Sequence, residues 1–395
     1  AISAANLTAI PAANITGTLP AISAANLTAI PAANITGTLP AISGASLTGV
    51  RDTTGGRKNL IINGGFDVWQ RGTSQVSATS VEQKYFADRF GIYPSGGTIT
   101  ADRVAFTQGQ TAVPGNPNYH ARIAMASGNA NNWALFKTQL ENPERLANQT
   151  YTISFWAKGT NPGGGNFQMY ENMYHNNGGT IVPNSENYTT VTVTSSWQKF
   201  TFTRTEAAWN STCVLGNNNY YYWSIIQPAA DTSTAAWTLD IANIQLELGS
   251  TATDFEHRSY GEELALCQRY FYNIFHGTAS NVKFDLHQYS ATGNAGWSAF
   301  TVPYPVPMRV SATFTHSMTN AKCQGGNVSS GSDEWTYYIQ NQGYANRQGN
   351  GNASTYSGGG QDKGIIGTYY VSSTSSTSSH IMIASGTTFQ FDAEL

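Results

Sequence analysis

The sequence predicts an all-β protein in which a repetitive fibrous shaft precedes a jelly-roll β-sandwich and a smaller distal β-sandwich, assembled as a trimer. Three observations lead to this prediction. Residues 1–20 recur without change at 21–40, short segments rich in β-branched and aromatic residues fill the chain from residue 59 onward, and only one segment has a clear helical pattern.

The repeat region, residues 1–50, predicts the shaft. The large apolar residues of one copy are Ile2, Leu7, Ile10, Ile15 and Leu19. Pro11 and Pro20 end the two halves of that copy, so each half reads as a short extended segment followed by a turn. Such segments bury little alone, and we expect three identical chains to wrap around a common axis and pool these side chains.

Two other interpretations of the repeats remain open. One is a disordered linker rich in Ala and Thr. The other is a pentapeptide solenoid, but the Ala-Asn-Leu/Ile-Thr units begin at positions 5, 13, 25 and 33, never five apart. The chain begins without Met, and we expect the shaft to continue upstream. Residues 51–59 are a glycine-bearing charged connector.

Composition argues against several functions. Charged residues make up 11% of the 395 residues and the net charge is −3, with no basic stripe, so no nucleic acid partner is expected. No stretch is apolar enough to span a bilayer, and no secretory signal is recognisable. Cys213, Cys267 and Cys323 are widely spaced and odd in number, which predicts neither a disulfide framework nor a zinc site.

Residues 60–258 predict the jelly roll. Period-two alternation is clear in TYTISFW from residue 150 and in KFTFTR from residue 199. A linking helix is expected at 259–272, because Ser259 and Glu262 have the spacing of a capping box. Strand-like text resumes at 273–395, the predicted distal sandwich that forms the tip.

The predicted helix has an apolar face. Leu264, Cys267, Tyr270 and Phe271 are expected to lie along it.

Several segments resemble tail-fibre and host-recognition proteins of tailed bacteriophages. These segments are LIINGGFDVWQRGTS at 60–74, YFADRF at 85–90, TYTISFWAKG at 150–159, the stretch at 244–271, PVPMRVSATFT at 305–315 and the terminal FDAEL. The resemblance implies a trimeric fibre located in the virion, with other tail or baseplate proteins as partners at its N-terminal end. It also implies attachment to a host surface polysaccharide, lipopolysaccharide or capsule.

The central section also resembles jelly-roll carbohydrate-binding modules of secreted glycoside hydrolases. The matching positions are Asn63, Gly64, Phe66 and Asp67, followed later by Asp240. In those modules an acidic pair helps to hold a structural calcium ion, which implies Asp67 and Asp240 as calcium ligands. This sequence has Asp where Glu is usual and a single Asp in the later strand, so it departs from the pattern.

Aromatic residues are the candidate sugar-binding groups, because flat rings stack on pyranose C–H groups. In the central section the candidates are Tyr170, Tyr174, Trp209 and the run at 220–223, from which Tyr221 and Trp223 are selected. In the distal section they are Trp335, Tyr338, Tyr344 and Tyr356, together with Arg347 as a partner for sugar hydroxyls, in a segment rich in Gly, Asn and Ser. For each ring of the central section, a place in the core or in a trimer interface is the alternative. For the distal loop, the alternative is a flexible linker.

The sequence has no recognisable catalytic signature. Its carboxylates form no acid-plus-nucleophile pattern, and Asp88 beside Arg89 predicts a buried ion pair. We therefore expect a binding protein rather than an enzyme. The alternatives are a passive trimerisation or spacer fibre, a glycan depolymerase, and a secreted bacterial glycan-binding module.

Overall fold

The computed structural model describes part of the chain in detail. It describes residues 57–274 apart from 127–131, 164, 175–186, 207, 209–218 and 229–233, together with 282–285, 287–289, 295–310, 312–316, 322–325, 337–338, 356–357, 363–371, 379–383 and 389–394. Contacts divide the chain into two units, 1–56 and 57–395. The predicted shaft lies outside the described residues. No helix among the described residues has the length and apolar character of a membrane span.

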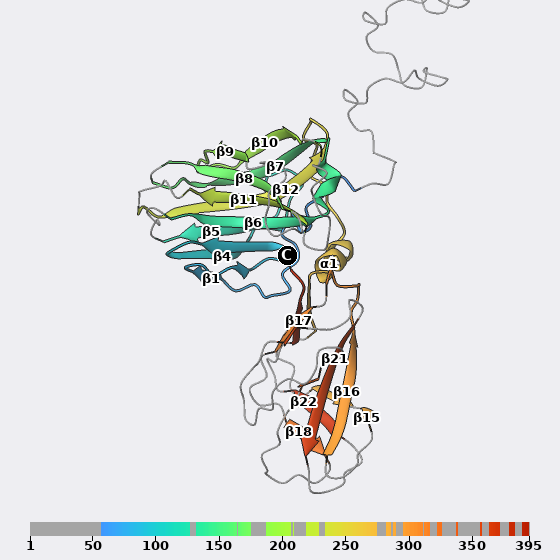
Figure 1. The fold of residues 1–395 in the computed structure, drawn as a ribbon. Helices are drawn as coiled ribbons and strands as arrows, with labels where there is room; N and C mark the ends of the chain where they lie inside the picture. Colours follow the sequence, from blue (N-terminus) through green and yellow to red (C-terminus); the bar gives the residue numbers. More distant parts are fainter. Residues whose placement is uncertain are drawn as a thin grey trace, which may run out of the picture. The chain divides into compact units, whose positions relative to one another are not determined.

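The central section is a sandwich of two six-stranded antiparallel sheets, as the sequence predicted (Figure 1). Sheet A has the order β1 (Val76–Thr79), β4 (Thr98–Ala105), β5 (Tyr119–Met125), β12 (Trp237–Leu248), β7 (Thr150–Thr160) and β10 (Gln198–Thr205). Sheet B has the order β2 (Lys84–Tyr85), β3 (Phe90–Pro94), β6 (Ala134–Glu141), β11 (Tyr220–Gln227), β8 (Phe167–Tyr174) and β9 (Asn187–Val191).

The core lies between the two sheets and is rich in aromatic rings. Phe90 and Phe136 stack with their centroids 5.3 Å apart, and Phe155 meets Trp223 edge-on at 5.6 Å. All four side chains are almost completely buried. Alternation along each strand sends these residues inward and their sequence neighbours outward.

The Asn-Gly segment at the start of the sandwich is a structural motif. It runs beside a bulge in β12, where the backbone of Ile244 donates a hydrogen bond to the carbonyl of Gly64 at 2.9 Å. A Cβ on Gly64 would lie 2.1 Å from the Ile244 carbonyl oxygen, so only glycine fits. The Asn63 side chain accepts from Val68 N–H and donates to the carbonyls of Val68 and Asp88.

The helix is shorter than predicted. Helix α1 spans Tyr260–Gln268 and begins with the predicted capping box between Ser259 and Glu262. It ends before residue 272, because Phe271 belongs to strand β13 (Phe271–Asn273), which pairs with the C-terminal strand β23 (Phe389–Asp392). The backbone hydrogen bonds of that pairing replace the helical ones at this point.

The distal section is also β-structure, and its described strands form three small sheets. Sheet C contains β13, β23, β17 (Thr313–His316) and β20 (Tyr356–Ser357). Sheet D contains β14 (Val282–Asp285), β22 (Ser379–Ile383) and β18 (Lys322–Gly325). Sheet E contains β15 (His287–Tyr289), β16 (Ala295–Pro303), β21 (Lys363–Val371) and β19 (Tyr337–Tyr338).

The residues after β23 bind to the sandwich through buried charges. Glu394 pairs with Arg89, and it also lies 3.3 Å from Arg71. Asp88 and Arg89 are both buried, but they do not pair with each other as the sequence suggested. Asp88 accepts two hydrogen bonds from Gln70 at 2.7 Å and lies 3.9 Å from Arg71.

Candidate functional site

A row of tyrosines lies on the outer side of sheet B. In β8 and β11 the odd-numbered side chains enter the core, so the even-numbered ones point outward. The antiparallel register places Tyr220 opposite Tyr174, and Tyr170 opposite Tyr188 of β9. We call this surface the tyrosine face; it consists of Tyr170, Tyr174, Tyr188, Tyr220 and Tyr222.

The five rings are in mutual contact. The centroids of Tyr174 and Tyr220 are 4.8 Å apart in a stacked arrangement, and those of Tyr170 and Tyr188 are also 4.8 Å apart. Tyr222 joins the two pairs, with its centroid 5.7 Å from that of Tyr170 and 6.2 Å from that of Tyr174. Because each ring is held by its neighbours on a rigid sheet, a ligand would meet a preformed aromatic surface.

Polar groups accompany the rings. Asn172 donates a hydrogen bond to the Tyr170 hydroxyl at 2.7 Å. The ammonium of Lys137 lies 5.3 Å from the centroid of Tyr222 and 3.4 Å from the Gln139 amide oxygen. The side chain of Gln139 also hydrogen-bonds Tyr220. These amide and ammonium groups are at most 6% exposed, so they position the rings.

Burial changes the ionisation of this surface. It raises the pKa of Tyr220, and it raises that of Tyr222 well above the usual phenol value, with neighbouring tyrosines adding to both shifts. It lowers the pKa of Lys137 to about 8. At neutral pH the phenols are uncharged and can both donate and accept hydrogen bonds.

Two of the predicted site residues are on the tyrosine face and two are not. Tyr170 and Tyr174 lie on it, as selected from the sequence. Trp223 is a core residue, 0% exposed, so the sequence prediction for it is wrong. Tyr221, 1% exposed, lies on the inner side of the sheet rather than on the tyrosine face, and its hydroxyl donates to the buried carboxylate of Glu171.

The alternation of β11 was the signal that could have shown which of its residues point outward. Trp223 is the largest apolar side chain of the segment 220–223, so it is expected to face the core and to mark the odd-numbered positions as inward. Tyr220 and Tyr222 then point outward. Tyr188 was also missed. Its position opposite Tyr170 depends on strand pairing that no local pattern shows.

The other sugar-binding candidates remain predictions. Trp209, Trp335, Tyr344 and Arg347 lie outside the described residues. Tyr338 and Tyr356 lie in strands β19 and β20, for which only the backbone is described.

The structure does not fit calcium at Asp240. Its carboxylate oxygens accept hydrogen bonds from Arg122 at 2.7 and 2.8 Å, and Lys158 lies 3.7 Å away. Two cations therefore already balance this charge, which corrects the ligand assignment. Asp67 instead accepts a hydrogen bond from Asn118 at 3.3 Å. Among the residues described, no group of three or more His, Cys, Asp and Glu is arranged to hold a metal ion.

Comparison with known proteins finds partial structural likeness only. No protein-family profile matches the chain, and no curated protein matches it. One similar structure is the enzymatically active domain of tailspike protein 4 of bacteriophage CBA120, with a TM-score of 0.29 and 10% identity over 48% of this chain and 21% of that chain.

Two other similar structures are carbohydrate-binding modules. The family 11 module of a cellulosomal cellulase of Clostridium thermocellum has a TM-score of 0.26 and 13% identity, covering 46% of this chain and all (100%) of that chain. A xylan-binding domain from Paenibacillus barcinonensis has a TM-score of 0.24 and 15% identity, covering 45% of this chain and 95% of that chain. TM-scores this low establish no function for this chain. The function proposed below rests on the residues of this chain alone.

Proposed function

We propose that this protein binds glycan chains through the tyrosine face. The observation that carries the proposal is the contact of five tyrosine rings on one side of sheet B, with ring centroids 4.8 to 6.2 Å apart. Sugar rings present C–H groups on their faces and hydroxyls at their edges. Tyrosine rings with their phenol hydroxyls match both parts of such a ligand.

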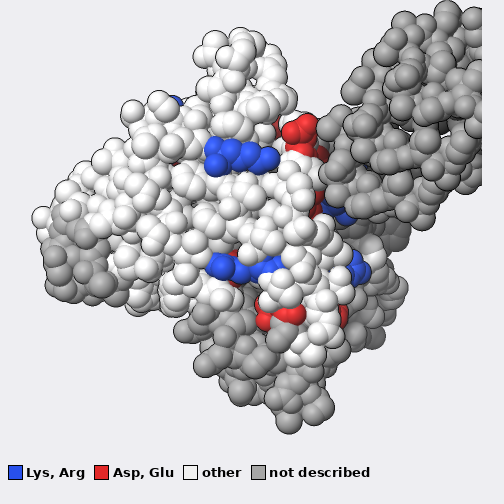
Figure 2. All heavy atoms as spheres, turned by 90° about the horizontal axis from the view of Figure 1, so that it is seen from above, with Lys and Arg blue, Asp and Glu red and all other residues white. Residues whose placement is uncertain are grey.

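The sparse charge of the molecule supports binding through ring and hydroxyl contacts, with any charge recognised locally. Charged residues are 11% of the chain, and in the view of Figure 2 the visible basic side chains lie apart from one another, several of them beside acidic side chains. The described residues in this view form no continuous basic patch, so we expect binding to depend on local contacts rather than on long-range steering.

We further propose that the glycan is host lipopolysaccharide or capsule and that the chain is part of a trimeric phage tail fibre. The repeats at 1–50 and the phage-like segments at 60–74 and 244–271 support this setting. Three weak sites on one stem would raise overall binding through effective concentration. Binding, rather than cleavage, is the proposed role.

The test is the replacement of single rings. Tyr222→Ala and Tyr174→Ala are each expected to weaken binding to a polysaccharide of the host surface about tenfold. Each removes one stacked ring, which contributes about 1.4 kcal/mol to the free energy of binding. Tyr260→Ala is the matched control, since Tyr260 is exposed but lies on α1. Binding is measured by affinity electrophoresis and calorimetry.

Two results would contradict the proposal. Equal weakening by Tyr260→Ala would show that the tyrosine face is not the site. Release of reducing ends or unsaturated sugars during the measurement would show that the protein cleaves glycan.

A further inference from the structure

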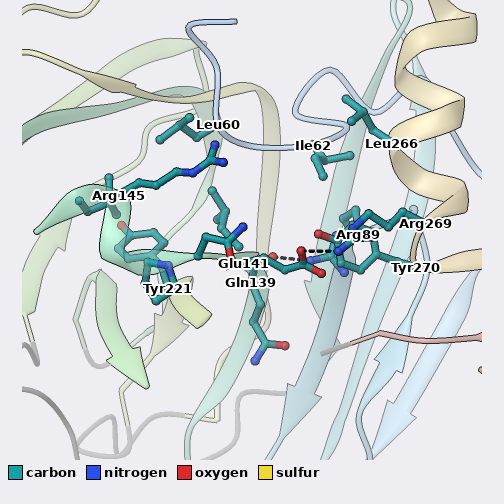
Figure 3. Close-up of a pocket in the computed structure, with 14 residues that line it drawn as sticks. Leu60, Ile62, Arg89, Gln139, Glu141, Arg145, Tyr221, Leu266, Arg269 and Tyr270 are labelled. Carbon is teal, nitrogen blue, oxygen red and sulfur yellow. Dashed lines mark hydrogen bonds and ion pairs between the residues drawn. The ribbon is translucent and has the colours of Figure 1, made fainter. Parts of the chain in front are cut away.

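A cavity of about 260 Å³ lies where the sandwich meets helix α1 (Figure 3). Its lining comes from the first residues of the sandwich, the end of β6, the beginning of β11, helix α1 and the 3₁₀ helix η6 (Pro143–Leu146). Leu60, Ile62, Leu146 and Leu266 give it an apolar wall. In Figure 3, Leu60 and Ile62 face the polar residues across the cavity.

The cavity adjoins the tyrosine face. Gln139 lines it and also hydrogen-bonds Tyr220 of that face. Glu141, another lining residue, is in register with Tyr220 across the β6 and β11 pair. A ligand that runs along the tyrosine face toward the start of β11 therefore arrives at this cavity.

The charges that line the cavity leave a positive excess. Three arginines and one glutamate line it. Arg89 pairs with Glu394, and Arg269 binds Glu141 at 2.9 Å, the contact drawn as a dashed line in Figure 3. Arg145 is exposed at the surface end of the lining and, among the described residues, forms no ion pair within 4.0 Å. Its guanidinium can take an anion in the planar, bidentate geometry that arginine favours.

We propose that this cavity is a subsite for an acidic sugar residue of the bound glycan, a residue whose charge is a carboxylate or a phosphate. The proposal rests on glycan binding by the tyrosine face. Arg145 binds the anionic group, and the leucine and isoleucine wall covers the C–H face of the ring. The volume is below the range of about 300 to 1,000 Å³ of pockets for drug-sized ligands, which suits one sugar residue rather than several.

The experiment uses the full chain on an array of bacterial surface polysaccharides. Each acidic polysaccharide is printed beside its carboxyl-reduced form, and each phosphorylated one beside its dephosphorylated form. The variants are Arg145→Gln, Leu266→Trp to fill the cavity, and Tyr222→Ala. Lys199→Gln is the matched control, because it removes the same charge from an exposed position on β10 of sheet A.

The expected result is binding to at least one acidic polysaccharide that falls at least tenfold when the acid is removed. The carboxyl-reduced and dephosphorylated arms identify which acid is bound. Arg145→Gln and Leu266→Trp reproduce that loss on the acidic form and have no effect on the neutral form. Lys199→Gln changes neither.

Two outcomes would overturn the proposal and separate it from glycan binding in general. If Tyr222→Ala weakens binding but Arg145→Gln and removal of the acid do not, the tyrosine face binds glycan and the acidic subsite is wrong. If no polysaccharide on the array binds the unmodified protein, glycan binding itself is wrong, and the subsite with it.

Discussion

Lys137 is the most unusual single residue of the tyrosine face. Its side chain is only 6% exposed, whereas lysine side chains, which are charged at neutral pH, usually lie in water. The Tyr222 ring and the Gln139 amide are its nearest partners, while Glu394 raises and Arg89 lowers its pKa. The desolvation of the ammonium outweighs these contacts, and so its pKa falls to about 8.

Lys137 makes stability depend on pH in a defined window. An unfolded lysine has a pKa of 10.5, so between pH 8 and 10.5 the unfolded chain binds more protons and the folded state gains stability as pH rises. We expect Lys137→Met to remove this rise, which is about 3 kcal/mol at most. The difference in free energy of unfolding between variant and unmodified protein is measured from pH 7 to 10 by denaturant titration.

Tyrosines with a raised pKa lower the free energy of unfolding as pH rises above 10. They are present in both the variant and the unmodified protein, so their effect cancels in the difference. Lys199→Met, which removes the same charge at an exposed site, is the control. A difference between Lys137→Met and the unmodified protein that stays constant across this range would contradict the lowered pKa.

Sequence patterns could predict whether a residue points inward or outward only where local alternation along a strand decides it. Tyr170 and Tyr174 lie on the outer side of β8, because Phe167 and Met169 fix which side faces the core, and their role in binding stays a prediction. Glu171 also occupies an odd-numbered, inward-facing position. The sequence around it does not show which groups balance its buried carboxylate. Its partners, Arg204 at 2.9 Å and the Tyr221 hydroxyl, come from distant strands.

At the scale of elements, the C-terminal strand β23 connects the distal section to the sandwich. Backbone hydrogen bonds join Ala393 to Tyr270 at 2.7 Å and Arg309 to Arg269 at 2.8 Å. Arg89, 2% exposed, lies over the ring of Tyr270 with its guanidinium carbon 3.4 Å from the centroid, and it pairs with Glu394. These contacts hold the last residues of the chain against the sandwich.

Removal of one partner of this buried pair should be costly. Glu394→Gln leaves the Arg89 charge uncompensated, and we expect it to lower the free energy of unfolding by about 3 kcal/mol. Asp392→Asn is the control, because Asp392 is 39% exposed and its contact with Arg71 is worth less than about 1 kcal/mol. The midpoint of denaturant unfolding is measured for both, and equal effects would contradict the role of Glu394.

The start of helix α1 could be predicted and its end could not. A capping box is local, four residues long and chemically specific, and Ser259 and Glu262 fit it. The end at Gln268 results from the pairing of Phe271 with Asp392, a contact that spans the whole distal section. Helix propensity of the local sequence cannot predict a strand pairing with a distant segment that ends the helix.

At the scale of the whole molecule, we propose that binding depends on the number of chains joined by the shaft. If three chains pool the Ile and Leu residues of 1–50, three tyrosine faces meet the same surface together. Such multivalency commonly strengthens binding by about 10²- to 10⁴-fold over a single site.

Charged substitutions in the shaft test this proposal. We expect Ile15→Asp combined with Ile35→Asp, at equivalent positions of the two repeats, to convert a trimer into monomers, because it places charge where apolar residues are pooled. Asn14→Asp combined with Asn34→Asp adds the same charge beside those positions and should leave the trimer intact. Sedimentation gives the mass of each, and a monomeric unmodified chain would contradict the trimer.

The pairing of β13 with β23 has a consequence for how such a protein can change. Strands β13 and β23 are paired, with Phe271 in register with Asp392, but β17 and β20 of the same sheet lie between them in the sequence. Segments whose two ends lie side by side can be exchanged for others of different length with little disturbance to the domain that carries them. We expect that such an exchange here would have to keep β17 and Arg309, because β17 pairs with β23 and the backbone of Arg309 bonds to Arg269.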